Sequence, residues 1–85
     1  MYPEKELMTR VEITALLGFK RTTFYMFKRL EGKFPPARGC RKHVPMYDLD
    51  EVAAFLFDHA PEYLTRTPDG MKLAAKIMKE KGIAN

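Results

Sequence analysis

The sequence is poor in cysteine and has no long apolar run. Cys40 is the one cysteine among 85 residues, so an intrachain disulfide is excluded and no second thiol can help to build a zinc site. Although 46% of the residues are hydrophobic, no stretch approaches the ~18 consecutive apolar residues of a membrane span. The first residues also lack the apolar core of a signal peptide. We therefore expect a cytoplasmic protein with neither a bound metal nor a membrane partner.

Motifs that carry catalytic chemistry are absent as well. No Ser/His/Asp set, no pair of carboxylates in an apolar stretch and no glycine-rich phosphate loop can be recognised. His43 and His59 are sixteen residues apart and only one thiol is present, so a zinc site is not expected. A single domain of this size buries roughly 60% of its unfolded surface, which leaves little room for a catalytic cavity. We expect a binding protein rather than an enzyme, and no cofactor.

The charged residues are unevenly distributed, although the formal net charge is only +4. Residues 18–47 hold eight basic residues against Glu31 alone, whereas residues 48–63 hold five acidic residues and no Lys or Arg. A basic block inside a nearly balanced chain is typical of a surface that binds a polyanion such as DNA.

The first half of the chain contains the signals of two helices joined by a short turn. Thr9 and Glu12 have the spacing of a capping box, in which each side chain bonds to the backbone amide of the other. This box predicts a helix over 10–17, which Gly18 ends. A second helix is predicted over 21–31. Two helices separated by three or four residues are typical of a helix-turn-helix motif.

The second predicted helix, which Gly32 would end, has two contrasting faces. At ~100° per residue, Phe24 and Phe27 lie on one side, and we expect them to pack in the core rather than to stack on single-stranded nucleic acid. The other side is polar and suits phosphates and base edges, which arginine and hydroxyl groups recognise. It carries Arg21, Thr22, Tyr25 and Arg29.

The two prolines at 35 and 36 cannot continue a helix. For the residues that follow, 37–47, a short β-hairpin is predicted. We expect residues 38–42 around Gly39 to form its tip and residues 44–47 its return strand. Pro45 lacks an amide donor, so this strand should lie at an edge of the sheet. A basic tip of this kind can follow a phosphate backbone or enter a minor groove.

A third helix is predicted over 49–59. Asp48 is a suitable N-cap, with Glu51 three residues later. The apolar side chains that recur at helical spacing on this segment should face the core. They are Val52, Phe55 and Leu56, with Leu49 and Ala53 at the edges.

A fourth helix is predicted over 68–81, from the N-cap Thr67 followed by Pro68 to the stop signal Gly82. Pro61 opens a possible hinge before it. One face of the helix either completes the core or binds a second protomer on an adjacent DNA site, and the sequence leaves both alternatives open. This face consists of Met71, Ala74, Ala75 and Met78, with Ile77 beside them.

Four segments follow one another over residues 6–57: LMTRVEITALLG, RTTFY, FP and VPMYDLDEVAAFL. In this order and spacing they resemble the AlpA family, which comprises short prophage-associated winged-helix regulators and excisionases. The family is distantly related to the DNA-binding head of MerR proteins. Two positions depart from the family pattern: Lys20 replaces the usual Ser or Thr cap, and Met26 replaces a basic residue.

The resemblance implies a fold that is mostly α with a small β-hairpin wing, namely a winged helix-turn-helix plus a C-terminal helix. Residues 1–60 would form the DNA-binding domain, and residues 61–85 a hinge and an amphipathic helix that either joins the same unit or serves association. The second helix would enter the major groove, and the wing at 37–43 would contact phosphate or the minor groove. The expected DNA-binding residues are Lys20, Arg21, Thr22, Thr23, Tyr25, Arg29, Arg38, Arg41, Lys42 and His43.

The implied function is sequence-specific binding of double-stranded DNA. The protein would act as a transcriptional regulator or as the excisionase of a mobile element, which binds adjacent sites and bends DNA to direct a recombinase. The alternative is an adaptor that uses the winged-helix scaffold, with its C-terminal helix as the docking surface for another protein. The sequence does not separate these roles.

Overall fold

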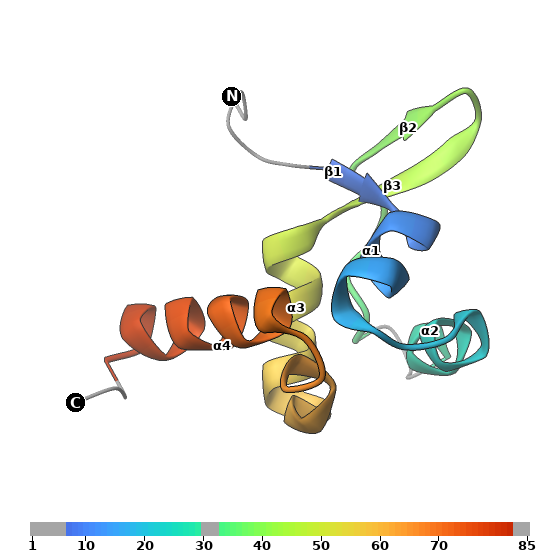
Figure 1. The fold of residues 1–85 in the computed structure, drawn as a ribbon. Helices are drawn as coiled ribbons and strands as arrows, with labels where there is room; N and C mark the ends of the chain where they lie inside the picture. Colours follow the sequence, from blue (N-terminus) through green and yellow to red (C-terminus); the bar gives the residue numbers. More distant parts are fainter. Residues whose placement is uncertain (1–6, 30–32, 83–85) are drawn as a thin grey trace.

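The structure is a computed structural model that describes residues 7–29 and 33–82. It is mostly helical, with a small three-stranded antiparallel sheet (Figure 1). The sheet lies at one end, α3 continues from its central strand, and α2 and α4 lie on opposite sides of α3. In chain order the elements are β1 (Leu7–Thr9), α1 (Arg10–Leu17), α2 (Arg21–Lys28), β2 (Gly39–Arg41), β3 (Val44–Asp48), α3 (Leu49–His59), a 3₁₀ helix (Pro61–Leu64) and α4 (Pro68–Glu80).

The predicted N-caps are confirmed. The Thr9 amide donates to Glu12 Oε1 at 2.9 Å, and the Glu12 amide donates to Thr9 Oγ1 at 3.3 Å, which completes the capping box of α1. Asp48 accepts from two amides in the first turn of α3, and Thr67 Oγ1 accepts from the Gly70 amide in α4. These caps supply partners to amides that have none within the helix, which is why the three helix starts could be read from the sequence.

The end of α1 is fixed to the start of α4. Gly18 ends α1 with φ +77°, and a Cβ at this position would lie 2.9 Å from Thr67 Cγ2. Besides capping α4, the Thr67 hydroxyl donates to the Leu16 carbonyl at 2.8 Å. The last helix therefore begins against the helix-turn-helix pair, 51 residues away in the sequence.

The sheet has the order β1-β3-β2, so β3 is its central strand. The expectation that Pro45 confines this strand to an edge is wrong for the strand as a whole. Its reason still holds locally: β1 pairs only with residues 46–48, and Pro45 is paired with β2 alone. Strand β1 was not predicted, because three residues are too short to show an alternating pattern.

The hairpin turns at Lys42 and His43 rather than around Gly39, which corrects the predicted tip. Both tip residues have positive φ, +50° and +68°, as the two-residue turns that match strand twist require. Gly39 lies in β2 opposite Met46. A Cβ there would lie 3.1 Å from Leu7 Cδ1, so close packing between strands, not turn geometry, favours glycine at this position.

Helix α2 ends three residues earlier than predicted. The amide of its C-cap, Arg29, bonds to the Met26 carbonyl at 3.1 Å, and this i→i−3 bond tightens the last turn. The predicted stop at Gly32 lies outside the described residues.

The core is aromatic where α2 meets β3 and α3. Phe24 and Phe27 are 1% and 4% exposed, and their rings lie 5.4 Å from Tyr47 and 5.8 Å from Phe55, edge to face. The prediction that these phenylalanines form the core is thus confirmed. Other elements complete the cluster with Ile13, Leu17, Phe19, Leu49, Val52, Ala53, Leu56, Ala60, Leu64 and Ile77.

The face of α4 that packs on the core differs from the predicted one by about one residue. Its core-facing residues are Gly70, Leu73, Ala74 and Ile77, whereas Met71 is 51% exposed and Ala75 is also exposed. Ala74 and Met78 are half-buried. The i, i+3, i+4, i+7 pattern occurs in both registers, and the contact with α3 and α1 selects the one that includes Ile77.

Candidate nucleic-acid interface

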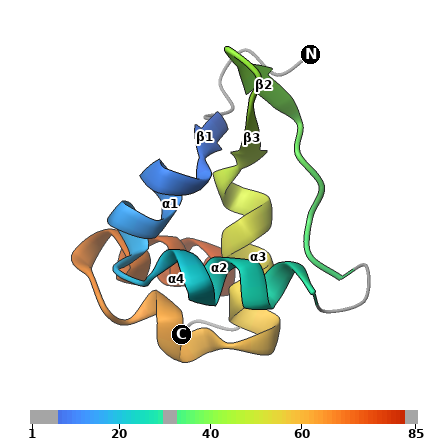
Figure 2. The same cartoon turned by 90° about the vertical axis from the view of Figure 1, so that its right-hand side faces the viewer.

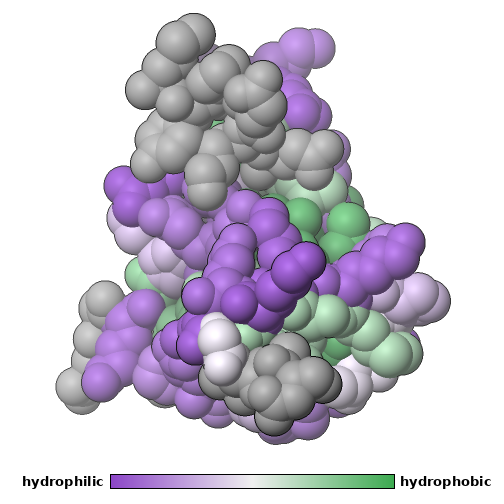
Figure 3. Space-filling view, turned by 90° about the vertical axis from the view of Figure 1, so that its left-hand side faces the viewer, coloured by the Kyte–Doolittle hydropathy of each residue, from purple (hydrophilic) through white to green (hydrophobic). Residues whose placement is uncertain are grey.

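Helix α2 and the hairpin β2–β3 lie on one side of the molecule, and Figure 2 looks onto this side. Two contacts join the hairpin to the pair of helices α1 and α2. Lys28 Nζ on α2 donates to the Tyr47 hydroxyl on β3 at 3.0 Å, and Arg41 on β2 contacts Glu12 on α1 at 3.5 Å. The other side, toward which the C-terminal end of α4 points, carries mostly hydrophilic side chains with an apolar patch near one edge (Figure 3).

The outer face of α2 presents the residues that the sequence analysis placed there. Thr23 is half-buried, while the burial of Phe24 and Phe27 turns the opposite side of the helix to solvent. Lys20 is the N-cap and makes no side-chain cap bond, because an ammonium has no acceptor for the amides of the first turn. The exposed site residues are Lys20, Arg21, Thr22, Tyr25 and Arg29, and none of their cations forms an ion pair with a described residue.

The basic residues of the hairpin fall into two groups. Lys42 and His43 project at the tip and are exposed. Arg38 precedes β2, and its guanidinium donates to both carboxylate oxygens of Glu51 on α3, at 2.9 and 2.7 Å. The prediction that Arg38 belongs to the tip is wrong, because this bidentate pair holds it against α3.

Glu12 keeps the hairpin and α1 in register. The hydrogen bond from the Thr9 backbone amide holds the pKa of the Glu12 carboxyl below its ordinary value, with help from the Arg41 guanidinium and against partial desolvation. Because Glu12 stays ionised, it caps α1 and attracts Arg41 at the same time.

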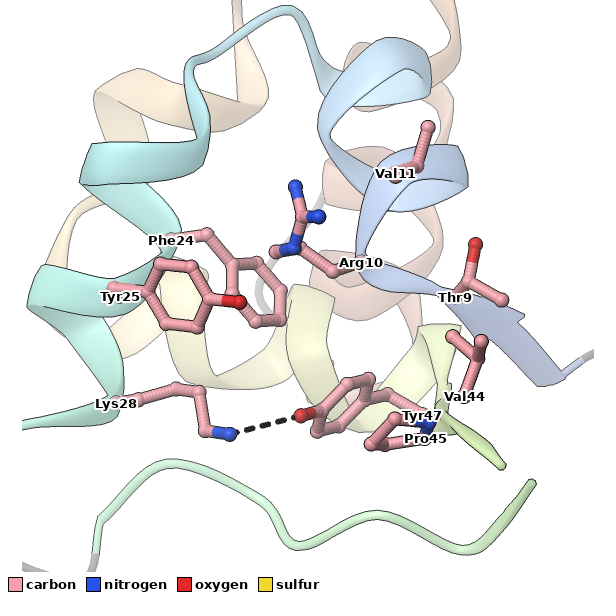
Figure 4. Close-up of a pocket in the computed structure, with 9 residues that line it drawn as sticks. All are labelled: Thr9, Arg10, Val11, Phe24, Tyr25, Lys28, Val44, Pro45 and Tyr47. Atoms are coloured by element: carbon pink, nitrogen blue, oxygen red, sulfur yellow. Dashed lines mark hydrogen bonds between the residues drawn. The ribbon is translucent and has the colours of Figure 1, made fainter. Parts of the chain in front are cut away.

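A pocket of about 170 Å³ lies between the start of α1, the middle of α2 and strand β3 (Figure 4). The two cations that line it, Arg10 and Lys28, were not among the predicted site residues. Lys28 is seven residues after Arg21 and three after Tyr25, so the helical wheel places it on their side of α2 and could have identified it. Arg10 is brought to α2 only by the tertiary fold. The lining residues are Thr9, Arg10, Val11, Phe24, Tyr25, Lys28, Val44, Pro45 and Tyr47.

Neither a metal cluster nor a membrane helix occurs in the described part of the chain. Within residues 7–29 and 33–82, no group of three or more His, Cys, Asp or Glu side chains could hold a metal ion. No helix in these ranges has the length and apolar character needed to cross a bilayer.

Comparison with protein-family models, curated proteins and solved structures finds no match to this chain.

Proposed function

We propose that this protein is a winged helix-turn-helix protein of the AlpA type that binds double-stranded DNA in a sequence-specific manner. Helix α2 enters the major groove, and the hairpin acts as the wing that contacts phosphates or the minor groove. The three-residue turn between α1 and α2 and the hairpin before α3 are compatible with this architecture.

The observation that carries the proposal is the group of exposed, unpaired cations on α2 and at the hairpin tip. Arg21 and Arg29 on α2 and Lys42 at the hairpin tip are exposed and form no ion pair with a described residue. The acidic residues of α3 instead contact cations elsewhere, for example Glu51 with Arg38. Exposed charges of one sign on one side of a molecule produce the field that attracts a DNA backbone.

The residue types on α2 fit base reading. An arginine at the start of the helix, Arg21, can bond to guanine O6 and N7 in the major groove. The hydroxyls of Thr22 and Tyr25 can bond to phosphates or base edges. Lys42 and His43 at the tip contact phosphates in this arrangement. Such contacts set affinity and orientation but do not discriminate between base sequences.

The biological role that we propose is regulation of transcription or excision of a mobile element, in the second case together with a recombinase. Footprinting on the DNA that flanks the gene separates the two. An excisionase should protect several adjacent sites and bend them in a circular-permutation assay, whereas a single unbent operator supports the regulator.

The salt dependence of duplex binding tests the proposal itself. If the interface neutralises about four to six phosphates, log K against log[salt] has a slope of roughly −4 to −5. A slope shallower than about −1 contradicts DNA binding. Weak, salt-insensitive binding to DNA beside tight association with another protein would favour the adaptor, for which exposed Met71 on α4 offers an apolar contact.

A further inference from the structure

The pocket between α1, α2 and β3 contains two cations and no acidic residue. Its lining includes Arg10 and Lys28, but neither Asp nor Glu. The acidic residue next along the helix, Glu12, accepts from the Thr9 amide and contacts Arg41 instead. A concave site with two positive charges and no counter-charge favours an anion.

The position of the Lys28 ammonium is fixed. It donates to the Tyr47 hydroxyl at 3.0 Å and lies 5.5 Å from the centre of that ring. Tyr47 is only 4% exposed and packs against Phe24, so it cannot move far. An ammonium has three N–H donors, and the bond to Tyr47 leaves others available to a ligand.

Arg10 approaches the same pocket from the other side. Its guanidinium carbon lies 5.6 Å from the centre of the Tyr25 ring, and Figure 4 shows it between α1 and α2. It forms no ion pair with a described residue. A cation–π contact at this distance occupies none of the N–H donors of the guanidinium, so they can bond to a phosphate.

The walls of the pocket are apolar and its volume is small. Val11 and Val44 are 59% and 46% exposed, and with Pro45 they form an apolar rim beside the cations. Pockets for drug-sized molecules occupy about 300–1,000 Å³, more than the 170 Å³ found here. The pocket therefore suits one charged group of a larger ligand, next to an apolar part of the same ligand.

We infer that this pocket binds one sugar–phosphate unit of a DNA strand, with Arg10 and Lys28 on the phosphate and Val11, Val44 and Pro45 against the deoxyribose. The inference rests on the proposed function and deepens it. The pocket lies between α2 and the hairpin, so a strand that touches both elements passes over it. Arg10 and Lys28 thereby set the register of α2 on the duplex without reading bases.

Variants of the two cations test the assignment in the full-length protein on its preferred duplex. We expect Arg10→Gln and Lys28→Met each to weaken binding about tenfold, and each to make the salt slope shallower by about one unit. Lys28→Arg, which keeps the positive charge, should retain most of the affinity. Lys79→Met is the matched control, because this lysine is exposed on α4 and has no described ion-pair partner. Thermal unfolding of each variant checks that the fold is intact.

A phosphate-by-phosphate replacement locates the contact. Uncharged methylphosphonate linkages are introduced one at a time into the duplex. At one position the replacement should weaken the wild-type protein about tenfold and should cause no further loss in the Arg10→Gln/Lys28→Met protein.

The outcomes separate the two proposals. A wild-type protein without salt-dependent duplex binding overturns the proposed function. If duplex binding depends steeply on salt but the folded variants bind like wild type, the pocket assignment alone is overturned. The same holds if every methylphosphonate weakens the Arg10→Gln/Lys28→Met protein as much as it weakens the wild type.

Discussion

Helices α2 and α4 resemble each other in pattern and differ in what surrounds their charges. Both have an apolar face on the core and a basic outer face. On α4, Lys76 lies 3.3 Å from Asp50, and the C-cap Lys81 lies 3.8 Å from Asp58, whereas Lys72 and Lys79 form no ion pair with a described residue. The cations on the outer face of α2 lie beside no described acidic residue. Part of the positive charge of α4 is therefore paired, whereas none of the cations on the outer face of α2 is paired with a described residue.

The difference has a simple origin in the fold. The acidic helix α3 packs against α4, so its carboxylates reach the lysines of α4. Exposed pairs of this kind contribute little to stability, but they reduce the positive field on that side. Helix α2 packs on α3 through Phe27 and Phe55 instead, and its cations point away from α3.

Removal of α4 is the strongest test of whether this helix belongs to the core. Truncation after Tyr63 deletes Leu64 and Ile77, both members of the core. Burial of each such side chain is worth about 1.5–3 kcal/mol, a large part of the ~5–15 kcal/mol that stabilises a domain. We expect the truncated chain to lose its cooperative thermal transition in circular dichroism.

A truncated chain that still unfolds cooperatively would contradict this account of α4. If it also bound a single site but lost cooperativity between adjacent sites, the association role of Met71, Ala74, Ala75 and Met78 would be supported instead.

Two substitutions within the proposed interface distinguish a residue that recognises bases from a residue that only attracts the phosphate backbone. Arg21→Ala should cost about 1–3 kcal/mol on the preferred duplex and reduce discrimination between sequences. Lys42→Ala should weaken all duplexes about equally and make the salt slope shallower by about one unit. Anisotropy titrations on preferred and scrambled duplexes measure both effects. Equal, sequence-independent losses would mean that α2 does not read bases.

Arg38 should behave like the paired lysines of α4. Because Glu51 holds it, Arg38→Ala should change duplex affinity less than Lys42→Ala. Its loss should lower the free energy of unfolding by less than about 1 kcal/mol, since the pair is half exposed. Urea unfolding and the same titrations provide both values. A loss of affinity as large as that of Lys42→Ala would place Arg38 in the interface.

The smallest expected effect concerns pH. The pKa of Glu12 is lowered in the folded protein, chiefly by the Thr9 backbone hydrogen bond. Its contribution to stability is thus fully present above its ordinary pKa of 4.5 and is lost as the pH falls through the folded value. Glu12→Gln should lower the thermal midpoint at neutral pH, and the difference from wild type should shrink in acid. A difference that does not change with pH would contradict this role.

Local chemistry made the helices predictable. The caps Thr9, Asp48 and Thr67 act within a few residues of themselves, so their geometry is already determined by the sequence. The same applies to the two faces of α2, where Phe24 and Phe27 are buried as expected. The C-terminal end of α2 was not predictable in this way.

What the sequence could not reveal depends on partners far along the chain. Strand β1 exists because it pairs with β3, about 40 residues later. The tip forms at Lys42 and His43, which lack the usual Asn-Gly signal of such turns. Arg38 looked like a tip residue because its partner, Glu51, belongs to another helix. Arg10 is likewise positioned by tertiary structure alone.

The central claim is that the cations on the side of α2 and the hairpin, not the total positive charge, bind DNA. Two triple variants with the same net charge test it: Arg21, Arg29 and Lys42 to Gln, and Lys72, Lys76 and Lys79 to Gln. The salt slope of duplex binding should become shallower by about two to three units in the first variant and should stay near the wild-type value in the second. An equal change in both slopes would contradict the account.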